Sequence, residues 1–196
     1  MFQVILSTFG IIFFAELPDK TALASLVLAT RYPARQVIIG AWLAFLVQTI
    51  VAVLAGSLLH LFPAQPIRIA SGLGFLAFAI LALRRREEED LKEEAREVVH
   101  TAGRRWAPWI TSFLVVFAAE WGDLTQLATA ALVAQATDPL PIAVGALAAL
   151  WSVTILAVVA GAQVGRLVTQ GVLQGFSAAL FAVAGILVIG SALVGS

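Results

Sequence analysis

Two short strings decide how this chain folds: Ala15-Glu16-Leu17-Pro18-Asp19-Lys20-Thr21 and Ala119-Glu120-Trp121-Gly122-Asp123-Leu124-Thr125. Each string places a glutamate and an aspartate three residues apart inside a long apolar segment. Residues three apart lie on one face of a helix, so each string presents two carboxylates in one direction. A charged side chain at bilayer depth costs on the order of a few kcal/mol, so four of them indicate a function.

The composition around these strings is that of an integral membrane protein. Of the 196 residues, 61% are hydrophobic and 12% are charged, whereas soluble domains carry about 25% charged residues. A transmembrane helix needs about 20 apolar residues. We place six such segments at 2–30, 35–61, 66–84, 107–135, 139–164 and 172–194. The sequence therefore predicts an all-α integral membrane protein with six transmembrane helices, in contact with membrane lipids.

Composition also excludes several kinds of function. The chain has no cysteine, which rules out disulfides, zinc–thiolate sites and cysteine nucleophiles. Its two histidines do not support a multi-histidine metal site, so we expect no resident cofactor. The net charge is zero, which gives nucleic acid binding no electrostatic support, and we expect no nucleic acid partner.

The two halves of the chain repeat each other. The two strings align at an offset of 104 residues, Gly40 and Ala41 match Gly145 and Ala146 at an offset of 105, and Phe75 matches Phe181 at an offset of 106. Three spans in register indicate duplication of a three-span unit. An odd number of spans inverts the second copy in the membrane, as in many secondary transporters. We predict repeats at 1–84 and 106–196, joined by a linker at 85–105.

The linker contains most of the charges in the chain. Seven of the 12 acidic residues lie between Glu87 and Glu97, and arginines flank this stretch on both sides. Basic residues gather in the loops after spans 1, 3 and 5, and the positive-inside rule puts those loops in the cytoplasm. We therefore predict a multi-pass protein of the inner (plasma) membrane with a charged cytoplasmic linker, partly helical, and with both termini outside.

The two strings supply the ligands of a hard cation. Pro18 lacks an amide hydrogen and Gly122 weakens a helix, so we expect a kink or a local break in both motifs. Hydroxyl and amide oxygens follow the carboxylates, and all-oxygen sites suit Ca²⁺, Mn²⁺ and Mg²⁺. The predicted cation ligands are Glu16, Asp19, Thr21, Glu120, Asp123, Thr125 and Gln126. Lys20 and Gln48 are candidate modulators, with an interhelical hydrogen bond the favoured role for Gln48.

The charge of this site predicts coupling to protons. Four carboxylates carry a charge of −4, or −3 with Lys20 counted, and one divalent ion leaves excess negative charge. Proton uptake by a carboxylate would remove that excess. The expected function is therefore exchange of a divalent cation for protons.

The repeated motif resembles Glu-x-Gly-Asp-(Lys/Arg)-(Thr/Ser), the signature of a family of small manganese and calcium exporters in bacteria, thylakoids and the Golgi. This family is grouped as a second calcium/cation antiporter branch. The resemblance covers the whole chain and implies that the seven predicted ligands line the cation path and that Mn²⁺ or Ca²⁺ leaves the cytoplasm. The chain departs from the pattern at Pro18, where the family has Gly, and at Leu124, where it has Lys or Arg.

Two other functions fit parts of the sequence. A passive channel for divalent cations would use the same ligands, and only a proton-gradient requirement separates it from an exchanger. Asp19 and Asp123 could also form an intramembrane aspartyl protease dyad, but such a dyad needs two carboxylates where this chain offers four. The choice between Mn²⁺ and Ca²⁺, the stoichiometry and the oligomeric state stay open.

Overall fold

The structure is a computed structural model that describes residues 1–16, 25, 28–29, 31–59, 62–84, 107–167 and 170–194. The described residues form α-helices without any strand, in agreement with the all-α expectation. The helices are α1 (Phe2–Glu16), α3 (Ala34–Leu59), α4 (Ala64–Arg84), α6 (Pro108–Ala119), α7 (Leu124–Val133), α8 (Leu140–Leu167) and α9 (Gln170–Val194).

Helix boundaries lie close to the predicted spans, because prolines mark where helices start. Pro108 is the first residue of α6, Pro63 directly precedes α4, and Pro141 lies in the first turn of α8. Proline suits these positions because the first amides of a helix have no acceptor within the helix. The predicted linker 85–105 and most of residues 17–30 fall outside the described residues.

The surface of the bundle is apolar. Among the described residues, α3 and the Leu140–Val159 part of α8 are long and apolar enough to cross a membrane. Shorter apolar stretches form α1, α6 and α7 and the parts Gln65–Leu81 of α4 and Phe181–Leu193 of α9. Large side chains such as Leu54, Leu58 and Leu187 are more than half exposed. Exposed large apolar side chains on several helices are expected where lipid chains cover the protein.

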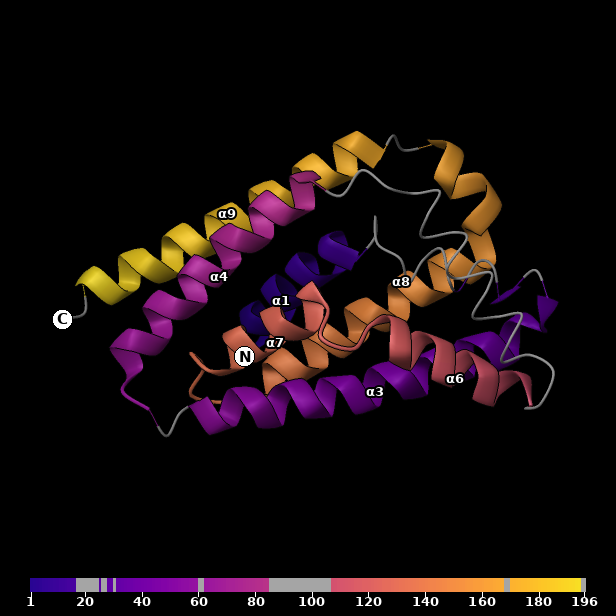
Figure 1. Ribbon diagram of the computed structural model, residues 1–196, viewed down its shortest axis with the longest axis horizontal. Coiled ribbons are helices and arrows are strands. Elements are labelled where there is room, and N and C mark those ends of the chain that lie inside the picture. The colour runs from indigo at the N-terminus through magenta and orange to yellow at the C-terminus, as the bar shows by residue number, and fades with distance from the viewer. Residues whose placement is uncertain are drawn as a thin grey trace.

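Helices of one half pack on helices of the other. In Figure 1, α4 and α9 run side by side along one edge of the bundle, and α3 runs beside α6. Helix α1 packs against α8 in the same way. The first helix of each half therefore contacts the second helix of the opposite half, and this crossing brings Glu16 toward the second motif.

Matching glycines allow these two crossed contacts. A Cβ on Gly40 of α3 would lie 2.7 Å from the Cβ of Ser112 in α6. A Cβ on Gly145 of α8 would lie 2.9 Å from the Cβ of Thr8 in α1. Gly145 follows Gly40 by 105 residues and Ser112 follows Thr8 by 104, the offsets found in the sequence. Small residues let helix backbones approach closely inside membranes.

Helices α3 and α8 also meet each other, at a pair of tryptophans. The rings of Trp42 and Trp151 stack with 4.6 Å between centroids. Each indole N–H donates to the backbone carbonyl of the other tryptophan, at 3.3 Å from Trp42 and 3.2 Å from Trp151. This contact joins α3 to α8 directly.

Candidate metal centre

The second motif interrupts a helix. Helix α6 ends at Ala119, and α7 begins at Leu124 with Asp123 as its N-terminal cap residue. Gly122 lies in the turn between them with φ of +76°, a conformation that glycine adopts without steric cost. The break expected from Gly122 is thus confirmed in the second motif, whereas the first motif beyond Glu16 lies outside the described residues.

Backbone and side-chain hydrogen bonds hold the shape of this turn. The Glu120 N–H donates to the Val116 carbonyl at 3.0 Å, and the Asp123 N–H donates to the Glu120 carbonyl at 3.2 Å. The Gly122 N–H donates to Oε1 of Gln126 at 2.8 Å. The amide of Gln126 therefore reaches back from the first turn of α7 and fixes the turn that separates the two carboxylates.

The two glutamates occupy equivalent places at the ends of buried helix faces. In α1 the buried residues are Thr8, Ile12 and Glu16, spaced four apart. Positions four apart lie one above the other on a helix, so Glu16 is the last described residue of a stripe that packs into the bundle. Glu120 continues the stripe that contains buried Ser112 and Val116 in α6. The offset between the two glutamates is 104 residues.

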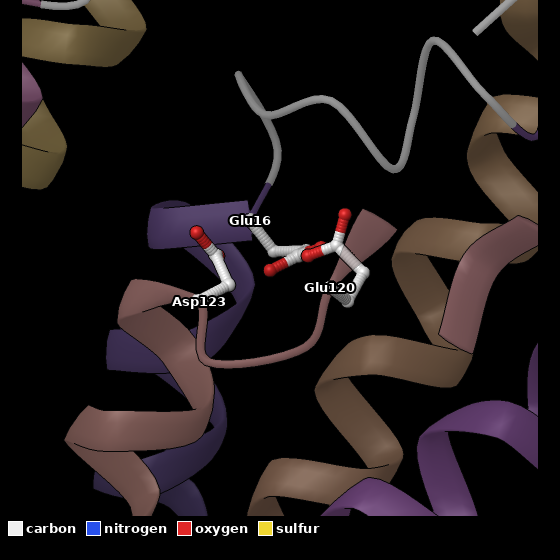
Figure 2. A group of neighbouring side chains, drawn as sticks. All are labelled: Glu16, Glu120 and Asp123. Carbon is white, nitrogen blue, oxygen red and sulfur yellow. The ribbon is translucent and has the colours of Figure 1, made fainter. Parts of the chain in front are cut away.

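Three carboxylates from the two halves meet at one point. One oxygen from each of Glu16, Glu120 and Asp123 lies within 4.8 Å of the other two. Glu16 is fully buried, Glu120 is 2% exposed, and Asp123 is partly buried. Figure 2 shows the side chains converging between the end of α1 and the turn that links α6 to α7. Sequence offset alone could not establish this meeting, because it says nothing about which helices are neighbours.

The geometry suits a hard divalent cation. Two oxygens bound to one Ca²⁺ at about 2.3–2.6 Å can be as much as about 5 Å apart, so separations up to 4.8 Å are compatible with a shared ion. The broken helix helps in two ways. The carbonyl end of α6 carries partial negative charge that favours a cation, and the amide end of α7 carries partial positive charge that favours carboxylates.

The other predicted ligands are placed as follows. Thr125 is buried in the first turn of α7, and its backbone carbonyl accepts a bond from the Thr129 hydroxyl at 2.7 Å. Gln126 accepts the hydrogen bond from the Gly122 N–H and so holds the turn. This role was not predicted from the sequence. The position of Gln126, three residues after the cap residue Asp123, is the signal that could have suggested it. Asp19, Thr21 and Lys20 lie outside the described residues.

Gln48 makes the interhelical hydrogen bond that the sequence favoured. It is 4% exposed, and its Nε2 donates to the Phe117 carbonyl of α6 at 3.1 Å. Phe117 lies in the last turn of α6, three residues before Glu120. Gln48 therefore contacts the backbone that leads into the carboxylate cluster.

Comparison with known proteins gives a family match in both halves of the chain. Residues 4–90 and 108–195 match the family described as divalent cation/proton antiporter GDT1. That description names a transporter rather than an enzyme. No solved structure matches the chain.

Similar curated proteins include one from Synechocystis and several from plants. The chain is 35% identical over 133 residues to a GDT1-like protein of Synechocystis, covering 61% of this chain and 65% of that protein. It is 34% identical over 207 residues to GDT1-like protein 2, chloroplastic, of Oryza sativa, covering 91% and 59%. It is 31% identical over 200 residues to Protein PAM71, chloroplastic, of Arabidopsis thaliana, covering 90% and 54%. The chain thus spans between about half and two thirds of the length of these relatives.

Proposed function

This chain belongs to the divalent cation/proton antiporter GDT1 family, and from that premise we propose that it carries Mn²⁺ or Ca²⁺ out of the cytoplasm in exchange for protons. The observation that carries the proposal is the cluster of Glu16, Glu120 and Asp123, whose oxygens come together from both halves of the chain. Carboxylates in a membrane protein interior mark ion pathways and proton relays, because burial of a charge without a function is too costly to persist.

The proposed site contains more than the described cluster. Asp19 is proposed as the fourth carboxylate, and oxygens of Thr21, Thr125 and Gln126 as neutral ligands. The Gln126 oxygen that accepts the Gly122 bond has a second lone pair, so holding the turn does not prevent it from contacting a cation.

The proposed architecture is six spans arranged as two inverted repeats, residues 1–84 and 106–196, with the linker 85–105 in the cytoplasm and both termini outside. The matched glycine contacts support it, because Gly40 packs on α6 as Gly145 packs on α1. A two-fold relationship between the halves would produce contacts of this kind. It would also place the substrate site between the first spans of the two repeats, near the membrane midplane.

Exchange follows from charge balance at this site. The three described carboxylates hold a charge of −3 when all are ionised, and a divalent ion neutralises only part of it. When the ion leaves, the carboxylates repel one another at short range in a medium of low dielectric constant. Proton binding to a carboxylate relieves that repulsion and lowers the negative charge of the empty site. The site therefore avoids a large buried charge both with the metal ion bound and while it is empty.

Transport in proteoliposomes containing the full chain tests the proposal. Mn²⁺ and Ca²⁺ are offered outside vesicles whose interior is acidic, and metal uptake is recorded together with the pH inside. The proposal expects uptake to rise with the proton gradient and the interior to become more alkaline as protons leave. Metal entry at the same rate without a pH gradient, and without proton movement, would instead identify a passive channel.

A further inference from the structure

The end of α6 next to the cluster is held by a residue from another helix. The last carbonyls of any helix lack intrahelical partners, and inside a membrane water does not replace them. The Val116 carbonyl receives the Glu120 N–H at 3.0 Å. The next carbonyl, that of Phe117, would bond Trp121 if the helix continued, but the chain turns away there and the carbonyl accepts from Gln48 instead.

We propose that Gln48 is a positioning residue for the cation site: its side-chain amide ties the break between α6 and α7 to α3 and so sets where Glu120 lies. This inference rests on the proposed transport function. Gln48 acts through the Phe117 carbonyl, three residues before Glu120.

The ring contacts of Phe117 show why the hydrogen bond from Gln48 can position the turn. The Phe117 ring stacks on Phe113 with 5.5 Å between centroids and contacts the Trp121 ring at 4.9 Å across the break. These ring contacts run along α6 and its turn, so they do not fix the turn relative to another helix. The bond from Gln48 does, because α3 is the long helix against which both α6 and α7 pack.

The bond also distinguishes the two halves. The position equivalent to Gln48 in α8 is Val153, which is buried and has no hydrogen-bonding side chain. The next pair of equivalent residues, Thr49 of α3 and Thr154 of α8, also differs in its hydrogen bonds. The Thr154 hydroxyl donates to the Leu150 carbonyl of its own helix at 2.8 Å, whereas the hydroxyl of its counterpart Thr49 is buried without a hydrogen-bond partner among the described residues. Of these two equivalent positions, Gln48 of α3 donates across to the other half, and its acceptor lies just before the second motif.

A double-mutant cycle tests the proposal. Gln48→Met keeps the volume of the side chain but removes the donor. Binding of Mn²⁺ to the purified full chain should weaken about threefold to tenfold, the size expected for one interhelical hydrogen bond in a membrane. If Gln48 acts through Glu120, the same substitution should have almost no further effect in a Glu120→Gln background. In a Glu16→Gln background it should still weaken binding by a similar factor.

Controls separate positioning from general stability. Thr154→Val removes a buried hydrogen bond from α8, the helix equivalent to α3. It should leave Mn²⁺ affinity unchanged. It should lower the thermal melting temperature at least as much as Gln48→Met does. Equal effects of Gln48→Met in the wild-type and Glu120→Gln backgrounds would overturn the positioning role. Failure of both Gln48→Met and Gln48→Leu to fold would overturn it too, since Gln48 would then be a general structural residue. If the wild-type chain binds no Mn²⁺ or Ca²⁺, it is the proposed function that fails.

Discussion

Phe75 of α4 stacks on Phe181 of α9, with 6.2 Å between the ring centroids and 25° between the ring planes. The two residues are equivalent in the sequence repeat, at an offset of 106. A residue that contacts its own counterpart lies close to the axis that would relate two halves. Figure 1 shows α4 and α9 running together along this edge. The glycines Gly72 and Gly185 bring the same two helices close, since a Cβ on Gly185 would lie 2.9 Å from the Gly72 carbonyl oxygen.

Removing any carboxylate of the two motifs should abolish transport. We expect Glu16→Ala, Asp19→Ala, Glu120→Ala and Asp123→Ala each to reduce metal uptake in proteoliposomes to background, because each loses a charged ligand of the proposed site. The protein should still be produced and inserted, since a buried carboxylate contributes little net stability to a fold.

Asp138→Asn is the matched control for these substitutions. Asp138 is an acidic residue outside the cluster, and its Oδ1 accepts the Leu140 N–H at 3.0 Å at the start of α8. Asparagine keeps that acceptor and removes only the charge, so uptake should stay at the wild-type rate. Full transport by any two of the four alanine variants would place the site elsewhere.

The turn in the second motif should require a residue that accepts positive φ. Gly122 has φ of +76°, and nothing lies within 4 Å of a Cβ added there. Gly122→Ala should therefore cause strain of about 1–2 kcal/mol without a steric clash. Metal affinity should fall several-fold, as the turn relaxes and Glu120 and Asp123 separate. Asparagine adopts this conformation more readily than other residues, so Gly122→Asn should bind metal better than Gly122→Ala. Equal affinities for both variants would count against the turn's role.

The close approach of α1 and α8 should tolerate no side chain at Gly145. A Cβ there would lie 2.6 Å from the Ile5 carbonyl oxygen. We expect Gly145→Ala to lower the free energy of unfolding by about 1–3 kcal/mol, as overpacking does. Gly190→Ala in α9 is the control, because nothing lies within 4 Å of its added Cβ and alanine favours a helix. In thermal melting in detergent, Gly145→Ala should lower the transition temperature and Gly190→Ala should not.

Gln126 should shape the turn whether or not a cation is bound. Its Oε1 accepts the Gly122 N–H at 2.8 Å. Gln126→Met removes this acceptor, so the Gly122 amide should exchange with solvent deuterium faster in metal-free protein. Gln126→Glu keeps an acceptor oxygen and should preserve slow exchange. Unchanged exchange in Gln126→Met would mean that the backbone alone maintains the turn.

The sequence by itself determined the elements and the chemistry of the candidate site. Six apolar segments, the glutamate and aspartate pairs and the offset of 104 residues are readable because hydrophobicity and helix period are local properties. The break at Gly122 is also local, since glycine is the residue that tolerates positive φ. These features predict an all-helical chain with carboxylates inside its apolar segments.

Only the tertiary structure decided which groups meet. The packing of α1 on α8 and of α3 on α6 brings Glu16 within reach of Glu120 and Asp123, residues more than a hundred positions away. The sequence also could not predict that the Phe117 carbonyl accepts the hydrogen bond from Gln48. A carbonyl lacks an intrahelical partner only where its own helix ends, and whether it finds another donor depends on the helix packed beside it. Such contacts depend on side-chain packing between distant segments, which no local pattern in the sequence contains.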